Sequence, residues 1–327
     1  MKRNIIFIIS ALTLLFTFAC EEVIEVDLPE VEAKMVIEGE INSNLPAMVI
    51  LSRNMNYFDV IDSAALSNMY ITDSNAIIVV SDGITLDTLS LQTITKFPYQ
   101  AFIGNKLLGE EGTSYTLNVS YQDKEYFATT SIPSSVPYSQ VWFEPQLNND
   151  SIGNLNFSFF DDANTDNYYL VSSLTIGTQW WWYKPAYGVP VFDDIFFNGD
   201  STIVSVSKGY EGNDFFQIDV ETDEERDSVL YFSIGDNVSL RLSSMDQDFY
   251  LWWNSYYRSE FTGSNPYSNP SAVLTNIEGD PALGVWGGYA NTLANIHITD
   301  SGTVEELTAE DILPLILPDS ISDFFNN

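Results

Sequence analysis

The chain has 327 residues and a formal net charge of −34, from 46 acidic and 12 basic side chains. Nucleic-acid binding depends on clustered Lys and Arg, and the basic residues here are scattered singly, so nucleic acid is excluded as a partner. Apolar residues still make up 45% of the chain and aromatic residues 14%. The chain can therefore bury hydrophobic cores, and its length indicates about two domains.

The first nineteen residues have the composition of a secretory signal peptide. Lys2 and Arg3 give a short basic start, and residues 5–18 are almost wholly apolar. This run is too short for a stable transmembrane helix of ~20 residues. Cys20 follows directly and is the only cysteine, which excludes an internal disulfide and a cysteine metal cluster. The arrangement resembles the lipobox of bacterial lipoproteins, which predicts lipidation of Cys20 and membrane attachment through the N-terminal lipid.

Residues 20–32 are predicted to form an acidic tether, and residues 33–132 an N-terminal β-sandwich of immunoglobulin or transthyretin type. Alternating or apolar runs predict short strands without a helix between them. Asp82-Gly83 is a hairpin signal, and Gly112-x-x-Tyr115 resembles a tyrosine corner. The strands are expected at 34–41, 47–53, 76–81, 84–91, 115–121 and 125–130.

Two prolines and two serines in segment 132–137 interrupt this pattern and predict a linker. Residues 138–327 are then expected to form a larger C-terminal β-domain, either a sandwich or barrel-like. In segment 237–243, Val238, Leu240 and Leu242 should face inward, and Asn237, Ser239 and Arg241 outward. The strands are expected at 155–159, 168–174, 202–207, 229–233, 237–243, 283–289 and 294–299.

One amphipathic helix is predicted over residues 245–261. Ser244 and Gln247 have the spacing of a capping box. An aromatic stripe follows at helical spacing and should pack on the second sheet. Its members are Phe249, Trp252, Trp253 and Tyr256. The predicted fold class is therefore all-β with a single helix.

Trp180, Trp181 and Trp182 are consecutive, and Tyr187 follows them closely. Successive side chains of a strand point to opposite faces, so the three tryptophans cannot all enter one core. At least one is then exposed or covered by a partner, which is typical of sugar stacking or a protein interface. In the alternative interpretation Trp181 alone is core and residues 184–190 cover the others.

Asp162, Asn164 and Asp166 alternate like the first ligands of a calcium-binding loop. The sixth position of that loop is Asn167 instead of Gly, and the twelfth is Ser173 instead of Glu. Asp and Asn are also preferred in tight turns, so an ordinary turn is the alternative to a weak calcium site. No cofactor is expected.

His297, the only histidine, lies between two isoleucines in an expected strand and is interpreted as structural. The chain has no Gly-x-Ser-x-Gly elbow, phosphate loop or His-Glu-x-x-His motif. We therefore expect a protein that is not an enzyme. A carboxylate pair for glycoside hydrolysis is the alternative that so acidic a sequence leaves open.

Several short motifs resemble one bacterial family when their order and spacing are taken together. They are EVDLP at 25–29, MVIEGEI at 35–41, DDIFFNG at 193–199, NPY at 265–267, NIEG at 276–279 and GVWGGY at 284–289. This set is similar to the Bacteroidota lipoprotein family labelled domain of unknown function 4249, over nearly the whole chain. The resemblance carries no established catalytic residues.

The resemblance implies an outer-membrane lipoprotein, lipid-anchored on the cell surface and encoded beside a TonB-dependent receptor. The expected role is that of a non-enzymatic accessory of such a transporter, which helps to capture or admit a small-molecule, peptide or glycan ligand. The alternative is a free-standing glycan-binding or adhesive surface lipoprotein.

Overall fold

The computed structural model describes residues 33–55, 62–73, 75–94, 100–179, 182–185, 190–209, 223–263, 272–300, 302–308 and 311–312. Strands dominate these residues, which confirms the all-β fold class. Lys34–Asn327 forms one compact unit. None of the described helices is long and apolar enough to cross a bilayer.

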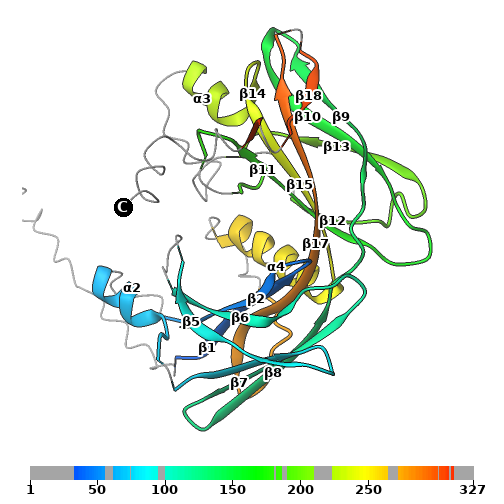
Figure 1. Cartoon of the computed structure of the whole chain (residues 1–327). Coiled ribbons are helices and arrows are strands. Elements are labelled where there is room, and N and C mark those ends of the chain that lie inside the picture. The colour runs from blue at the N-terminus through cyan, green and yellow to red at the C-terminus, as the bar shows by residue number, and fades with distance from the viewer. Residues whose placement is uncertain are drawn as a thin grey trace, which may run out of the picture. The chain divides into compact units, whose positions relative to one another are not determined.

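The largest sheet has nine strands among the described residues, in the order β12-β11-β15-β17-β1-β2-β6-β5, with β18 paired to β17 (Figure 1). Its pairings are antiparallel except that of β1 with β17, which is parallel. The strands are β1 (Met35–Asn42), β2 (Pro46–Arg53), β5 (Ser90–Thr93), β6 (Gln100–Leu108), β11 (Tyr168–Thr175), β12 (Val191–Asp193), β15 (Asn237–Met245), β17 (Ala282–Ile298) and β18 (Val304–Glu306).

Two smaller sheets complete the β structure of the described residues. The five-stranded sheet has the order β16-β8-β7-β3-β4, and in the four-stranded sheet β10 pairs with β9, β13 and β14. Their strands are β3 (Ile77–Ser81), β4 (Leu86–Thr88), β7 (Ser114–Tyr121), β8 (Lys124–Ser131), β9 (Tyr138–Gln146), β10 (Asn149–Phe160), β13 (Ser201–Val206), β14 (Phe232–Ser233) and β16 (Glu278–Gly279).

Separate hydrophobic cores lie between the large sheet and each smaller one. The core beside the five-stranded sheet joins Ile37 and Val49 to Leu117 and also takes in Trp286, all at most 1% exposed. The cores beside the four-stranded sheet are built from Phe157, Tyr169, Leu240, Phe232 and Val238. The large sheet is therefore one wall of both sandwiches.

β17 connects the two sandwiches. Its first half pairs with β1, from Met35↔Ala282 to Asn42↔Tyr289, and its second half pairs with β15, up to Asn237↔His297. The prediction of two strands at 283–289 and 294–299 is wrong, because residues 290–293 continue the ladder with β15 instead of turning. The large sheet thus combines strands from both sides of the predicted linker at 132–137.

Most other predicted strands lie within two residues of observed ones. The clear alternation of 115–121 appears in its burial, whereas both faces of 237–243 are largely buried. The prediction at 229–233 is wrong, because α3 (Asp223–Leu230) precedes a two-residue β14. The run 84–91 is divided between β4 and β5. β6, β9 and α2 (Ser63–Met69) were not predicted; Asp62 caps α2 by accepting from the Ala65 backbone N–H.

The amphipathic helix is present as α4 (Gln247–Gly263) and packs on the large sheet through Phe249, Tyr250 and Tyr257. The predicted cap at Ser244 is wrong. Asp246 caps the helix instead, because its Oδ1 accepts a hydrogen bond from the Phe249 N–H at 2.9 Å. Ser244 is the last residue but one of β15, and its buried hydroxyl has no partner among the described residues.

The tyrosine corner is confirmed by its hydrogen bonds. The Tyr115 hydroxyl accepts from the Glu110 N–H at 2.8 Å and donates to the Leu108 carbonyl at 3.4 Å. These two hydrogen bonds attach the backbone of residues 108–110 to the Tyr115 side chain of β7, as in sandwiches of immunoglobulin type.

Candidate functional site

Of the predicted aromatic contact residues, Trp180, Trp181 and Tyr187 lie outside the described residues. Trp182 is described and half-buried. Its place follows from the next residue, because Tyr183 and Ser173 exchange both backbone hydrogen bonds, at 2.8 and 2.9 Å. This bridge holds Trp182 beside β11.

Arg241 of β15 meets the Trp182 ring. The guanidinium carbon lies 4.5 Å from the ring centroid, which is a cation–π contact. Arg241 Nε also donates to the Ser172 hydroxyl at 2.8 Å. Arg241 is therefore held between Ser172 and Trp182 on one face of the large sheet.

A cavity of about 620 Å³ opens beside this pair. We call it the Trp182 cavity. It is bordered by the end of β1, the turn after it, and the β15–β17 face of the sheet. Its lining residues are Glu40, Asn42, Ser43, Asn44, Leu45, Glu111, Ser135, Trp182, Arg241, Tyr289, Asn291 and Leu293.

Side chains on this face of the sheet form a polar ladder. The Ser239 hydroxyl donates to Asn295 Oδ1 and the Ser243 hydroxyl to Asn291 Oδ1, each at 2.6 Å. Both serines are at most 4% exposed. As predicted, Ser239 lies on the face of β15 opposite to Val238 and Leu240. That face is nevertheless buried too. Buried central strands normally carry apolar side chains on such a face, so this polar one needs its own explanation.

Burial also shapes the ionisation of the cavity groups. It raises the pKa of the Tyr289 hydroxyl well above its ordinary value, and that hydroxyl is hydrogen-bonded to the Glu40 carboxylate. Burial lowers the pKa of Arg241. Tyr289 is therefore a neutral donor at physiological pH. The cavity contains a guanidinium on β15 and a carboxylate on β1, and β17 lies between these two strands.

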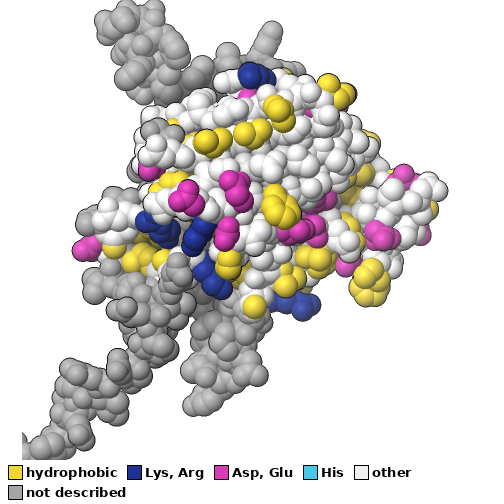
Figure 2. Space-filling model, turned by 90° about the horizontal axis from the view of Figure 1, so that it is seen from below, with side chains coloured by type: hydrophobic (Ala, Val, Ile, Leu, Met, Phe, Trp, Pro, Cys, Tyr) yellow, Lys and Arg dark blue, Asp and Glu magenta, His cyan; other side chains and the backbone are white. Residues whose placement is uncertain are grey.

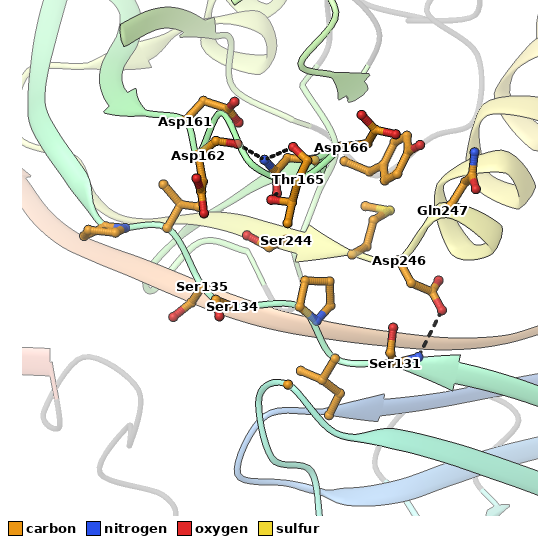
Figure 3. Close-up of a pocket in the computed structure, with 18 of the residues that line it drawn as sticks. Ser131, Ser134, Ser135, Asp161, Asp162, Thr165, Asp166, Ser244, Asp246 and Gln247 are labelled. Atoms are coloured by element: carbon orange, nitrogen blue, oxygen red, sulfur yellow. Dashed lines mark hydrogen bonds between the residues drawn. The ribbon is translucent and has the colours of Figure 1, made fainter. Parts of the chain in front are cut away.

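A second cavity, of about 790 Å³, lies beside the predicted calcium loop (Figure 3). The linker segment 131–137, loop residues 160–168 and the start of α4 border it. In Figure 3 Asp162 and Asp246 lie on opposite sides, and the Asp246 carboxylate points toward Ser131. Asp246 Oδ2 accepts hydrogen bonds from the Ser131 N–H at 3.2 Å and from the Thr130 hydroxyl.

The calcium loop has the contacts of a tight turn. Asp162 Oδ1 accepts from both the backbone N–H and the side-chain amide of Asn164, at 3.1 and 2.6 Å. Asn164 thus presents a donor to Asp162 and not an oxygen to a shared ion. Among the described residues no three His, Cys, Asp or Glu side chains are placed to hold a metal. The structure favours the turn interpretation for Asp162, Asn164 and Asp166.

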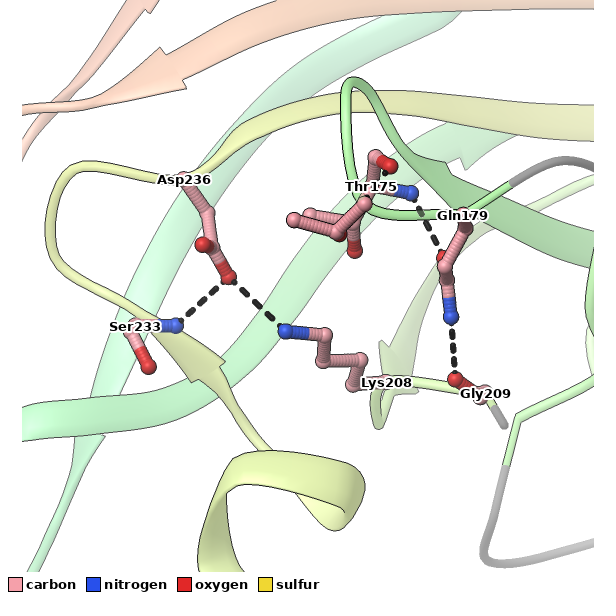
Figure 4. Close-up of polar contacts among 7 residues, drawn as sticks. Thr175, Gln179, Lys208, Gly209, Ser233 and Asp236 are labelled. Atoms are coloured by element: carbon pink, nitrogen blue, oxygen red, sulfur yellow. Dashed lines mark hydrogen bonds and ion pairs between the residues drawn. The ribbon is translucent and has the colours of Figure 1, made fainter. Parts of the chain in front are cut away.

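Other candidate polar groups have structural partners. His297 Nδ1 faces Asn237 Oδ1 at 2.9 Å, which supports its interpretation as structural. Lys208 pairs with Asp236 at 3.3 Å, and Asp236 also accepts from the Ser233 N–H (Figure 4). In the same view Gln179 joins the Thr175 N–H to the Gly209 carbonyl. These contacts hold a loop against the sheet and present no nucleophile with an activating base.

On the face that Figure 2 shows, apolar side chains lie singly or in small groups among acidic and basic ones. Over the described residues, the most exposed large apolar side chains include Ile84, Leu147 and Phe196, each at least 94% exposed. They lie on separate elements. Isolated apolar residues of this kind are normal on soluble proteins.

Sequence reasoning identified Trp182 but missed the residues that surround it, Arg241, Tyr289, Asn291 and Glu40. The signal was present in part. Arg241 is one of only 12 basic residues and stands at an outward position of the clearest alternating strand. What the sequence could not supply is the pairing of β15 with β11 and β17 and of β17 with β1, which brings the four residues to Trp182.

Comparison with known proteins places the chain in one family. No curated protein matches it. The family model described as a domain of unknown function (DUF4249) matches residues 21–293, which is most of the chain. The chain therefore belongs to the family of the domain of unknown function 4249.

Proposed function

We propose that this protein is an outer-membrane lipoprotein of the cell surface that serves a TonB-dependent transporter as a non-enzymatic accessory in ligand capture. The observation that carries the proposal is the junction at Cys20. An apolar signal-like segment ends there, and the family match begins at the next residue, 21. This arrangement supports our proposal of a folded β body on a lipid tether.

The rest of the molecule supports a binding role. The Trp182 cavity offers an aromatic ring, a guanidinium and amides, which can hold a ligand without covalent chemistry. Accessory capture requires such a surface and no activated nucleophile. The net charge of −34 keeps a crowded surface protein soluble and repels nucleic acid.

The experiment is purification of the tagged, lipidated protein from gently solubilised outer membranes, with mass spectrometric identification of co-eluting proteins. We expect a TonB-dependent receptor at a near-stoichiometric level and a membrane fraction that depends on Cys20. Cys20→Ser is the control, because it removes only the acylated thiol and should release the protein from the membrane. Recovery of the wild-type protein alone, at normal abundance, would overturn the transporter role.

A second candidate, a free-standing glycan-binding surface lipoprotein, is favoured by one observation. Trp182 borders a concave site flanked by Asn, Tyr and Glu, and not a flat apolar face. Both candidates use the same cavity and differ in whether a transporter co-purifies.

A further inference from the structure

The buried polar ladder beside the Trp182 cavity is unusual for the central strands of a sheet, and a bound ligand would explain it. Ser172, Ser239 and Ser243 are buried on central strands of the large sheet, where apolar side chains would stabilise the fold more. Their hydroxyls orient Arg241, Asn295 and Asn291. A buried row of small polar residues that positions longer polar ones is the construction of a binding site.

Arg241 provides hydrogen-bond donors in the lining of the cavity. Of its five N–H groups, the one on Nε is used by Ser172, and among the described residues its guanidinium makes no other hydrogen bond. Its planar face is occupied by the Trp182 ring. The remaining N–H groups belong to a residue that lines the cavity, so they can pair with two adjacent acceptors of a ligand.

Acceptors and mixed groups stand beside these donors. The Glu40 carboxylate is oriented by its hydrogen bond to Tyr289. Asn42, Asn44 and Asn291 add side-chain amides, each with both a donor and an acceptor group. The cavity lining therefore contains both donors and acceptors together with one aromatic ring.

This combination excludes most ligand classes. An apolar ligand would remove water from the Arg241 guanidinium and the Glu40 carboxylate without adding a hydrogen bond to either. An anion would be repelled by Glu40, by Glu111 and by a chain of charge −34. A cation would meet Arg241 at close range. A neutral polyol satisfies every group, because each hydroxyl both donates and accepts and a sugar ring stacks on indole.

We propose that the Trp182 cavity binds a neutral saccharide, whose hydroxyls pair with Arg241, Glu40 and the neighbouring amides beside the Trp182 ring. The cavity volume of about 620 Å³ accommodates one or two sugar rings. The inference rests on the proposed function only in that it names the class of ligand captured.

The test uses the purified body of the protein from residue 21 onward, the span in which the family match and the compact unit lie. The probes are neutral glucan, mannan and galactan oligosaccharides of two to six units, together with the matched uronic-acid series. Binding is measured by titration calorimetry and by tryptophan fluorescence. We expect saturable binding of a neutral oligosaccharide and a loss of at least tenfold in affinity for Trp182→Ala and for Arg241→Ala.

Matched controls separate binding from folding. Trp142→Ala removes a half-buried tryptophan of β9, and Arg53→Ala removes an arginine that also lies near an aromatic ring, Tyr121 at 6.0 Å; both should bind like wild type. Asn44→Gly removes one amide of the cavity at a backbone position with φ of 65°, which glycine tolerates. It should weaken binding severalfold without loss of fold.

Three results would overturn the inference: no binding by any neutral oligosaccharide, binding of the uronic-acid series alone, or binding unchanged in Trp182→Ala and Arg241→Ala. A co-purifying transporter without saccharide binding overturns this inference and leaves the proposed function standing. Saccharide binding without a co-purifying transporter supports this inference and overturns the transporter role.

Discussion

At the scale of single residues, Asp246 performs two structural tasks. One carboxylate oxygen caps α4 through the Phe249 N–H, and the other joins the helix to β8 through Thr130 and Ser131. The group is largely removed from water, and this burial raises its pKa above the ordinary carboxyl value. The same side chain thus links the helix to the five-stranded sheet and carries a desolvation cost when ionised.

This raised pKa predicts a definite pH dependence. The native protein binds the Asp246 proton more tightly than the unfolded chain, so the stability contributed by this group falls as pH rises from about 3.9 toward its native pKa. We expect the difference in unfolding free energy, wild type minus Asp246→Asn, to decrease between pH 4 and pH 7. Denaturant titrations at unit pH intervals measure it. A difference that grows with pH contradicts the assignment.

At the scale of elements, β15 and α4 show what the sequence can and cannot reveal. The alternation of Val238, Leu240 and Leu242 correctly predicts the apolar face of β15, because one side chain in two must enter a core. The opposite face of the strand, with Ser239 and Arg241, reads as solvent-exposed. Its burial depends on strand pairings and neighbours from distant parts of the chain, which local periodicity does not encode.

The packing of α4 depends equally on a distant residue. The Phe249 ring occupies the space that a side chain on Gly287 would need, since a Cβ added there would lie 2.3 Å from Phe249 Cγ. The helix stripe was predictable from its spacing. The sequence showed Gly287 only as part of a Gly-rich motif and did not indicate that Phe249 packs against it.

This contact gives a prediction for α4. Phe249 is 6% exposed and stacks on Tyr289, with ring centroids 5.7 Å apart. Phe249→Ala should cost about 3–5 kcal/mol of unfolding free energy, because it removes a buried aromatic ring and leaves a cavity. Leu251→Ala, on the exposed side of the same helix, should cost about 0.5 kcal/mol. Chemical denaturation compares the two; equal costs would show that α4 does not depend on the sheet.

At the scale of the whole molecule, β17 makes the two sandwiches one structure. Trp286 in its first half is fully buried against the five-stranded sheet and donates from Nε1 to the Tyr115 carbonyl at 3.1 Å. Asn276 holds the same residue by both backbone groups, at 2.8 and 3.0 Å. Ile296 and Ile298, in its second half, belong to the core beside the four-stranded sheet. Unfolding of either core therefore strains a strand that the other needs.

This continuity predicts a single unfolding transition. Trp286→Ala in one core and Phe232→Ala in the other should each cost about 3–5 kcal/mol, since both side chains are fully buried. Because β17 spans both cores, either change should increase amide exchange in β7 and β10 to a similar extent, although each strand lies in a different sandwich. Hydrogen exchange with mass spectrometry, read on peptides from the two strands in each variant, measures the coupling. If Trp286→Ala lowers amide protection in β7 and leaves the protection of β10 at the wild-type level, the two sandwiches are independent domains. Residues 132–137 would then mark the boundary between two units that unfold separately, although the large sheet contains strands from both.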